Sequence, residues 1–166
     1  LRRLERLDEL MGDLGHAQSV VKVSDAAGQK AIWEVRASGL NIMMSMKSEG
    51  KPVSFIEDCA VPLEAIADYT ERLTEVFTRH GTKGTWYAHA SVGCLHVRPV
   101  LNLKLEKDAR TMRAIAEEAF AMVKEYKGSH SGEHGDGLVR SEFHEQMYGA
   151  KTVSLFEEVK DRFDAA

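Results

Sequence analysis

The sequence predicts an α+β fold, in which an antiparallel sheet carries helices packed on one face. Segments with helical periodicity alternate with short runs of β-branched and aromatic residues along the 166 residues. Two such runs, 85–92 and 94–103, flank a single glycine, Gly93, as the strands of a hairpin do. The length and the hydrophobic fraction of 43% are sufficient for one globular domain with a sizeable core.

The first half of the chain begins with a predicted helix at 1–13, in which leucines recur at spacings of three and four residues. The β-branched run at 18–23 favours a short strand, and the pattern at 27–38 favours a helix that stops at Gly39. The next segments are an ambiguous stretch at 40–47, a loop at 48–52 and a strand at 53–61 that ends at Pro62.

The second half contains the clearest helices. Apolar residues recur at helical spacing from Ile66 to Phe77, and Gly81 follows as a C-terminal cap. Pro99 has no backbone N–H, so the second strand of the hairpin is predicted to be an edge strand or to contain a bulge. The remaining predicted elements are a helix at 107–127, a glycine-rich loop at 128–137 and a helix at 152–163.

Composition excludes several classes of protein. The net charge of −4, with both signs spread along the chain, does not suggest a nucleic-acid surface. No apolar run approaches the ~20 residues that span a membrane, and the charged start of the chain is unlike a signal peptide. Cys59 and Cys94 form no disulfide framework. We therefore expect a cytoplasmic protein, either in solution or peripheral at the inner membrane. The chain starts without methionine inside a predicted helix, which suggests a fragment of a longer protein.

His89 and His96 are the first candidates for chemistry, because they flank the predicted turn at Gly93. On one continuous strand their odd spacing would put them on opposite faces, but on the two strands of a hairpin they can face the same way. Two imidazoles at cross-strand separation can share a divalent ion. The alternative is that each is an ordinary polar residue on a half-exposed strand.

Glu133 and His134 are the second candidates, because they lie between glycines in the segment SGEHGDG. Glycines let a ligand approach the backbone closely, and a carboxylate beside an imidazole can bind a metal or exchange protons. A solvated loop explains the same composition equally well. A metal site in which Glu133 joins His89 and His96 would account for both features.

Arginines near these features could bind an anionic substrate through their planar guanidinium groups. These are Arg36, Arg98 and Arg140, although each taken singly is typical of a surface residue. Cys94 could be a soft metal ligand or a small buried residue. The other histidines have no evident partner and are interpreted as surface residues: His16, His80, His130 and His144.

Taken as an ordered set, these segments resemble the C-terminal domain of FAD-linked oxidases, a family that includes D-lactate dehydrogenases, glycolate oxidase subunits and D-2-hydroxyglutarate dehydrogenases. The resemblance covers nearly the whole chain and is most similar to large bacterial flavin dehydrogenases fused to an iron–sulfur oxidoreductase region. The matching segments are AIWEVRASGL, EDCAVP, HASVGCLHVRPVLNL, SGEHGDGLVRS and FEEVKDRFD.

The resemblance implies a ferredoxin-like α+β domain over 1–166 and a set of roles. His89, His96 and Glu133 would bind zinc or manganese, His134 would lie beside the flavin and accept a proton, and Arg36 would hold the substrate carboxylate. The contacts that this chain itself makes to the flavin would come from Glu133, His134 and Gly135. The implied reaction is oxidation of a D-2-hydroxy acid to the 2-oxo acid, with hydride transfer to FAD.

Departures from the family pattern put the substrate in doubt. Ser91, Val92 and Cys94 stand where many relatives have Gly, Asp and Asn, and Ile56 stands in place of a substrate-binding Lys. Arg98, where relatives often have Asn, is therefore a candidate to bind substrate instead.

The FAD-binding domain that supplies most flavin contacts in relatives is missing from this chain, so the isolated chain is expected to be inactive. The resemblance implies partners in that domain and in an iron–sulfur domain or another electron acceptor. Two other functions stay open at this point. One is a non-catalytic assembly module that docks on the FAD-binding domain, and the other is a stand-alone metal hydrolase.

Overall fold

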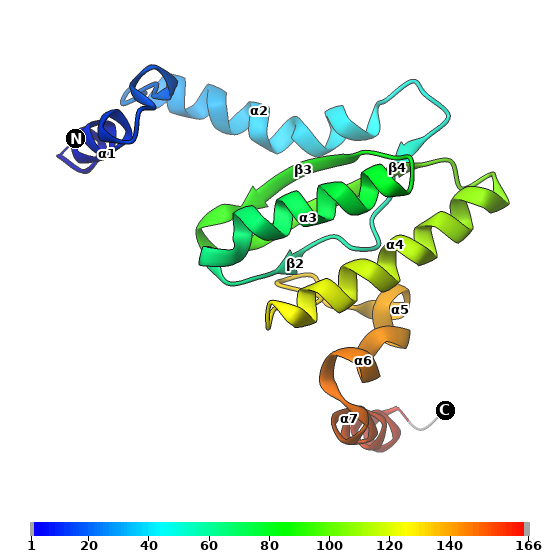
Figure 1. Ribbon diagram of the computed structural model, residues 1–166. Coiled ribbons are helices and arrows are strands. Elements are labelled where there is room, and N and C mark those ends of the chain that lie inside the picture. Colours follow the sequence, from blue (N-terminus) through cyan, green and yellow to red (C-terminus); the bar gives the residue numbers. More distant parts are fainter. Residues whose placement is uncertain (1, 165–166) are drawn as a thin grey trace. The chain divides into compact units, whose positions relative to one another are not determined.

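The computed structural model describes residues 2–164, apart from the side chain of Leu40, and divides into two compact units at 1–45 and 46–166. The first unit is helical (Figure 1), with α1 (Arg2–Asp13), a 3₁₀ turn (Ala17–Ser19) and α2 (Ala26–Met44). The Asp25 side chain caps α2 by accepting a hydrogen bond from the Gly28 N–H at 2.6 Å.

Two predictions for the first unit were wrong. Residues 18–23 form no strand, because no other described strand lies alongside to complete a ladder. The helix predicted to stop at Gly39 continues to Met44. A glycine inside a helix costs only about 1 kcal/mol, which the helix-forming residues around it outweigh.

The second unit is built on a four-stranded antiparallel sheet, so the α+β prediction is confirmed. The central strand is β4 (Cys94–Leu101), which pairs along one side with β3 (Gly84–His89). Along its other side it pairs with two short strands, β1 (Lys51–Pro52) and β2 (Cys59–Ala60).

The predicted hairpin is confirmed, since β3 and β4 pair from Gly84↔Pro99 to His89↔Cys94 around a 3₁₀ turn (Ala90–Val92). Gly93 ends this turn with φ = 72°, and a Cβ atom there would lie 1.9 Å from the Val61 carbonyl oxygen. Only glycine fits this close approach.

Of the two alternatives for Pro99, the edge strand was wrong, because β4 is paired on both sides. The Pro99 carbonyl accepts a hydrogen bond from the Val53 N–H at 2.9 Å, so its missing N–H faces the same side. On that side residues 53–58 leave the ladder between β1 and β2. For the same reason the strand predicted at 53–61 is reduced to Cys59–Ala60.

Helices α3 (Ile66–Arg79) and α4 (Glu106–Glu125) cover one face of the sheet (Figure 1). Their buried faces meet alternate residues of the hairpin, such as Leu95 and Val97, in a single apolar core. The buried side chains that α3 and α4 contribute to this core are Tyr69, Leu73, Val76, Phe77, Ile115, Ala116, Ala119, Phe120, Met122 and Val123.

The chain order β2, α3, β3, β4, α4 is completed by a bridge between Ala60 and Ser129, which places the start of the 128–136 loop against β2. This βαββα order, closed by a short strand-like contact, is the ferredoxin-like arrangement. The remaining elements of the second unit are 3₁₀ turns (Leu63–Ala65 and Ser141–Phe143) and the helices α5 (Gly137–Arg140), α6 (His144–Tyr148) and α7 (Ala150–Phe163).

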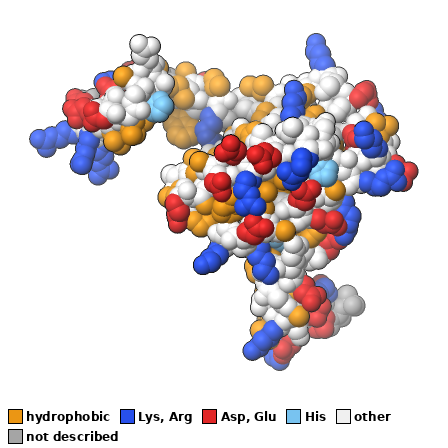
Figure 2. Space-filling model, viewed as in Figure 1, with side chains coloured by type: hydrophobic (Ala, Val, Ile, Leu, Met, Phe, Trp, Pro, Cys, Tyr) orange, Lys and Arg blue, Asp and Glu red, His pale blue; other side chains and the backbone are white. Residues whose placement is uncertain are grey.

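The surface over α3 and α4 mixes acidic and basic side chains, as Figure 2 shows for the face turned to the viewer. Arg79 pairs with Glu118 at 2.5 Å, and Arg72 pairs with Glu125 at 2.8 Å. Neither sign dominates this face, in keeping with the small net charge. None of the helices in the described part of the chain is long and apolar enough to cross a membrane.

Candidate functional site

The candidate site lies on the face of the β3–β4 hairpin opposite to α3 and α4. Tyr87 is directly across from His96, and side chains two residues apart on a strand share a face. Hence His89, His96 and Arg98 all project from this side, while Leu95 and Val97 project into the core. The hairpin thus brings the two histidines to the same face of the sheet, although they are an odd number of residues apart in the sequence.

His89 and His96 converge with Glu133 from the 128–136 loop. The Glu133 Oε1 atom is 3.2 Å from His89 Nε2 and 2.9 Å from His96 Nε2. All three residues offer a ligand atom within 4.8 Å of the other two. Two ligand atoms on a tetrahedral zinc ion, at ~2.1 Å from the metal, are about 3.4 Å apart. The three residues therefore fit a divalent ion.

This group is open on one side. The His96 side chain is only 2% exposed, whereas those of His89 and Glu133 are 41% and 42% exposed. A catalytic metal site keeps one position for water or substrate, whereas a structural site is closed. The exposure of two of the three residues is what the first kind of site requires.

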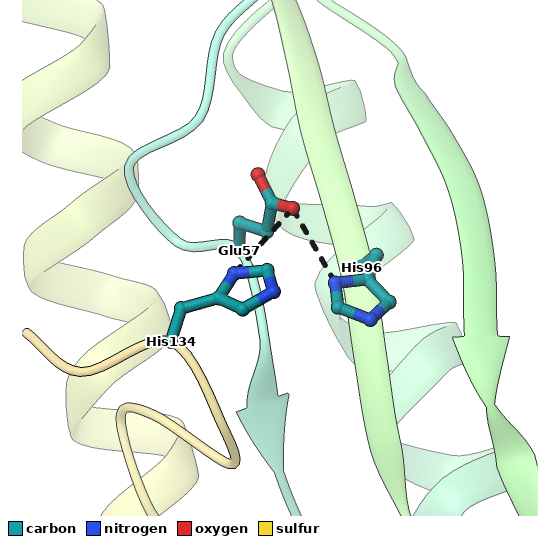
Figure 3. A group of neighbouring side chains, drawn as sticks. All are labelled: Glu57, His96 and His134. Carbon is teal, nitrogen blue, oxygen red and sulfur yellow. Dashed lines mark ion pairs between the residues drawn. The ribbon is translucent and has the colours of Figure 1, made fainter. Parts of the chain in front are cut away.

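Glu57, His96 and His134 form a second group of possible metal ligands, which shares the His96 imidazole with the first (Figure 3). Its Oε1 atom is 3.3 Å from His96 Nδ1 and 3.8 Å from His134 Nδ1, and a metal could in principle lie among these three side chains. The same oxygen accepts a hydrogen bond from an Arg98 NH2 group. A guanidinium in that place repels a cation, so the group with Glu133 is the better metal site.

Asp58 holds the loop that carries Glu133 and His134. Its Oδ2 atom accepts hydrogen bonds from the N–H groups of Glu133, at 2.9 Å, and His134, at 2.8 Å. The hydroxyl of Ser131 donates a third bond to the same atom at 2.7 Å. Burial raises the pKa of Asp58, but these donors together with Arg140 outweigh burial and lower it to about 2.

Arg140 completes this anchor from α5. Its NH1 group donates to Asp58 Oδ1 at 2.7 Å and to the His130 carbonyl at 2.8 Å, and it also contacts the Glu57 carbonyl. The Arg140 NH2 group donates to the Gly135 carbonyl. Asp58 is fully buried and Arg140 is 6% exposed, so a buried ion pair fixes both ends of the Glu133–His134 segment.

Burial shifts the pKa of two groups of the site, the His96 imidazole and the Cys94 thiol, in the direction of their neutral forms. Burial lowers the pKa of His96, against the opposing effect of Glu57 and Glu133, which favours the neutral imidazole that a metal needs. Burial, followed by Glu133, raises the pKa of the Cys94 thiol to about 11. Cys94 is buried, and its Sγ atom lies 3.8 Å from the Asp58 carbonyl oxygen. Of the two alternatives for Cys94, a metal ligand or a small buried residue, these observations favour the second.

A cavity of about 170 Å³ adjoins Glu57 and His134. The backbone around Gly135 forms part of its wall, and Gly135 itself has φ = 80°, a conformation that favours glycine. The lining residues are Ser54, Phe55, Glu57, His134, Gly135, Asp136, Val139 and Arg140. The cavity places His134 beside space for a small ligand.

The two arginines predicted to bind substrate, Arg36 and Arg98, lie in different surroundings. Arg36 lies on α2 in the first unit, where its guanidinium is 5.7 Å from the ring centre of Trp33. Arg98 is 3% exposed, and its NH1 group has no hydrogen-bond partner among the described residues. Substrate binding by either residue stays a prediction.

Three residues that organise the site were not recognised in the sequence as such: Glu57, Asp58 and Arg140. Glu57 and Asp58 stand together in EDCAVP, an acidic pair before a short apolar strand, which is the only local signal. His130, interpreted from the sequence as a surface residue, is fully buried and 4.2 Å from Phe120 between ring centres. That interpretation was wrong because Phe120 of α4 and Tyr148 of α6 pack against the ring.

Comparison with known proteins gives a family match and several relatives. The profile of the family described as FAD linked oxidases, C-terminal domain, matches residues 1–166. The chain is 31% identical over 162 residues to a D-2-hydroxyglutarate dehydrogenase of Escherichia coli (strain K12), which covers 96% of this chain and 16% of that protein. It is 23% identical over 163 residues to the glycolate oxidase subunit GlcD of Bacillus subtilis (strain 168), covering 98% and 34%.

A third relative is the mitochondrial D-lactate dehydrogenase [cytochrome] of Kluyveromyces lactis, 25% identical over 143 residues. The match covers 85% of this chain and 24% of that protein. The chain thus spans between about a sixth and a third of the length of these curated relatives.

Proposed function

The chain belongs to the family of C-terminal domains of FAD linked oxidases, and from this we propose that it forms the substrate side of an active site that oxidises a 2-hydroxy acid to a 2-oxo acid. The observation that carries the proposal is the convergence of His89, His96 and Glu133, with His134 beside them. The names of the relatives, which include dehydrogenases of 2-hydroxyglutarate and lactate, support the substrate class.

A divalent metal, zinc or manganese, would be held by His89 Nε2, His96 Nε2 and a Glu133 carboxylate oxygen. When bound, such an ion supplies Lewis-acid chemistry, which lowers the pKa of a hydroxyl group in contact with it. The interatomic distances of 2.9 Å and 3.2 Å around Glu133 support this donor set.

His134 is the proposed proton acceptor. Oxidation of the hydroxyl carbon removes a hydride and a proton, and FAD, when bound, provides the hydride acceptor. The His134 side chain is 50% exposed and lines the cavity, and its Nε2 atom is 3.4 Å from Glu133 Oε1. A neutral imidazole in this position can take the hydroxyl proton and pass it to solvent.

The substrate carboxylate requires a cation. Arg36 is our first candidate, because Arg98 already donates to Glu57 and would have to use its buried NH1 group. We propose that a D-2-hydroxy acid such as lactate, glycolate or 2-hydroxyglutarate is the substrate.

The partner we propose is an FAD-binding domain of the same protein, because the chain spans only 16% of its 31% identical relative. Two very exposed apolar side chains stand close in sequence to site residues, Leu138 at 97% beside Val139 of the cavity wall and Val92 at 68% in the turn after His89, and would be covered by such a domain. An iron–sulfur region as electron acceptor remains a prediction from the family resemblance.

The first prediction tests the metal role in the full-length protein. His89→Ala and Glu133→Ala should each reduce bound zinc or manganese to background and lower kcat/KM for a D-2-hydroxy acid by more than about 100-fold, because each removes a ligand. Elemental analysis and a dye-coupled activity screen measure both quantities.

His80→Ala is the matched control, since His80 also contacts a carboxylate, Glu118, at 2.6 Å but lies outside the site. It should retain both metal and activity. Full turnover without metal in either ligand variant would refute the metal role. A protein that binds the FAD-binding domain normally but shows neither metal nor oxidation would favour the assembly-module alternative.

A further inference from the structure

We propose that Glu57 and Arg98 are positioning residues, forming a buried pair that sets the orientation of both site histidines. Glu57 would face the Nδ1 atoms of His96 and His134, which leaves the Nε2 atoms directed toward the metal and the substrate. This inference rests on the metal site of the proposed function and adds to it the groups that prepare its imidazoles.

The geometry centres on one carboxylate oxygen. Glu57 Oε1 is 3.3 Å from His96 Nδ1, 3.8 Å from His134 Nδ1, and accepts a hydrogen bond from Arg98. Figure 3 shows the Glu57 carboxylate pointing between the two rings. The rings themselves are 5.2 Å apart between centres and inclined by 30°, so the Glu57 carboxylate faces both, with His96 the nearer.

The contact decides which nitrogen of each ring is free. A neutral imidazole carries its proton on one nitrogen only, and an acceptor beside Nδ1 keeps the proton there. The buried Nδ1 atom of His96 has no aligned hydrogen bond to any described residue, so Glu57 is the acceptor within reach. A small rotation of the carboxylate completes the bond, and the Nε2 lone pair remains for the metal.

Arg98 holds the Glu57 carboxylate in place. Its Nε atom donates to Ser54 Oγ at 2.9 Å, and its NH2 group donates to Tyr87 Oη at 3.2 Å as well as to Glu57. The guanidinium carbon is also 5.3 Å from the Tyr87 ring centre, and that ring stacks on His96 at 4.5 Å. Arg98 is thus fixed on several sides, as suits a supporting cation.

Burial gives this pair its importance. Glu57 is 8% exposed and Arg98 is 3% exposed, and a buried charge without its partner is strongly destabilising. Arg98 lies two residues after His96 on β4, so both side chains project from the same face of the strand. The Glu57–Arg98 pair is therefore attached to the strand that carries the proposed metal ligand. The positive charge of Arg98 also argues against a second metal ion at Glu57.

The test measures zinc affinity in the full-length protein by competition with a chelating dye, together with the number of zinc ions per chain. Glu57→Gln should weaken zinc binding about 10- to 100-fold with the stoichiometry unchanged, as loss of a group that orients a ligand does. A fall in stoichiometry on this substitution would make Glu57 a ligand and overturn the positioning role.

Glu118→Gln is the control, because Glu118 contacts a histidine, His80, and an arginine, Arg79, away from the site. Its zinc affinity should stay within about twofold of the wild type. A second variant, Glu57→Gln with Arg98→Met, removes the stranded guanidinium and restores stability. Zinc affinity that stays weak in this double variant supports positioning, whereas affinity that recovers with stability overturns it.

The metal role and the positioning role can be tested separately. Wild-type affinity in Glu57→Gln overturns the positioning role alone and leaves the metal site intact. A wild-type protein that binds no zinc or manganese overturns the metal role and the positioning role together. Background binding in His89→Ala calibrates the assay.

Discussion

Asp58 shows how a single residue can build a site without touching the reaction. It has φ = 57°, which is uncommon outside glycine, and its carboxylate receives the backbone of Glu133 and His134. Arg140 balances its charge from a position 82 residues further along the chain. The placement of the Glu133–His134 segment therefore depends on a fully buried carboxylate that the sequence alone does not mark.

Asp58→Asn tests this dependence. The substitution leaves Arg140 buried opposite an amide and turns one acceptor atom into a donor, so the free energy of unfolding should fall by about 3–5 kcal/mol. Denaturant unfolding measures the loss, and zinc affinity should fall with it because Glu133 is released. Asp161→Asn, at an exposed position on α7, should change stability by less than about 0.5 kcal/mol. Equal stability of the two variants would contradict the role of Asp58.

His130 gives the fold a dependence on pH. Burial lowers its pKa to about 4, whereas the unfolded chain has the ordinary value of 6.5. Between these values the unfolded state binds more protons, so stability is complete above about pH 6.5 and falls as the pH decreases toward 4. The full loss approaches about 3 kcal/mol.

Chemical denaturation at a series of pH values measures this effect, and His130→Leu should remove the decline between pH 6.5 and 4. Asp58 acts in a separate, lower range, since its lowered pKa of about 2 contributes stability that is lost only below pH 3.8. A decline in the same range that survives in His130→Leu would show that another group is responsible.

At the scale of elements, the β3–β4 hairpin is the part that local sequence specifies best. Two β-prone runs around Gly93 predict it, and the structure pairs six residues on each side. The segment 53–61 was harder to predict, because its apolar alternation resembles a strand. Residues 53–58 instead leave the ladder and carry Glu57 and Asp58, which bond to the hairpin and to α5.

Gly93→Ala tests the hairpin. A Cβ atom would meet the Val61 carbonyl at 1.9 Å, and φ = 72° disfavours any side chain, so the second unit should lose at least about 2 kcal/mol. Thermal unfolding followed by circular dichroism measures the change. Gly39→Ala is the contrast, because its Cβ atom meets nothing within 4 Å on a helix and alanine should stabilise that helix by about 0.5–1 kcal/mol. Unchanged unfolding in Gly93→Ala would contradict the close approach.

At the scale of the whole molecule, periodicity predicts the fold class and the core, because both depend on repeating apolar positions in each element. The candidate ligands His89, His96 and Glu133 could be proposed from spacing and family resemblance, and the structure brings them together. The supporting residues could not be proposed in this way. Glu57 meets Arg98 across 41 residues and Asp58 meets Arg140 across 82, and no local pattern encodes such contacts.

The most direct test of the account is anomalous X-ray diffraction at the absorption edge of the bound metal, from crystals of the full-length protein. We expect one anomalous peak about 2.0–2.2 Å from His89 Nε2, His96 Nε2 and a Glu133 carboxylate oxygen. A metal-loaded crystal with no peak at these three atoms, or with its peak among Glu57, His96 Nδ1 and His134, would contradict it.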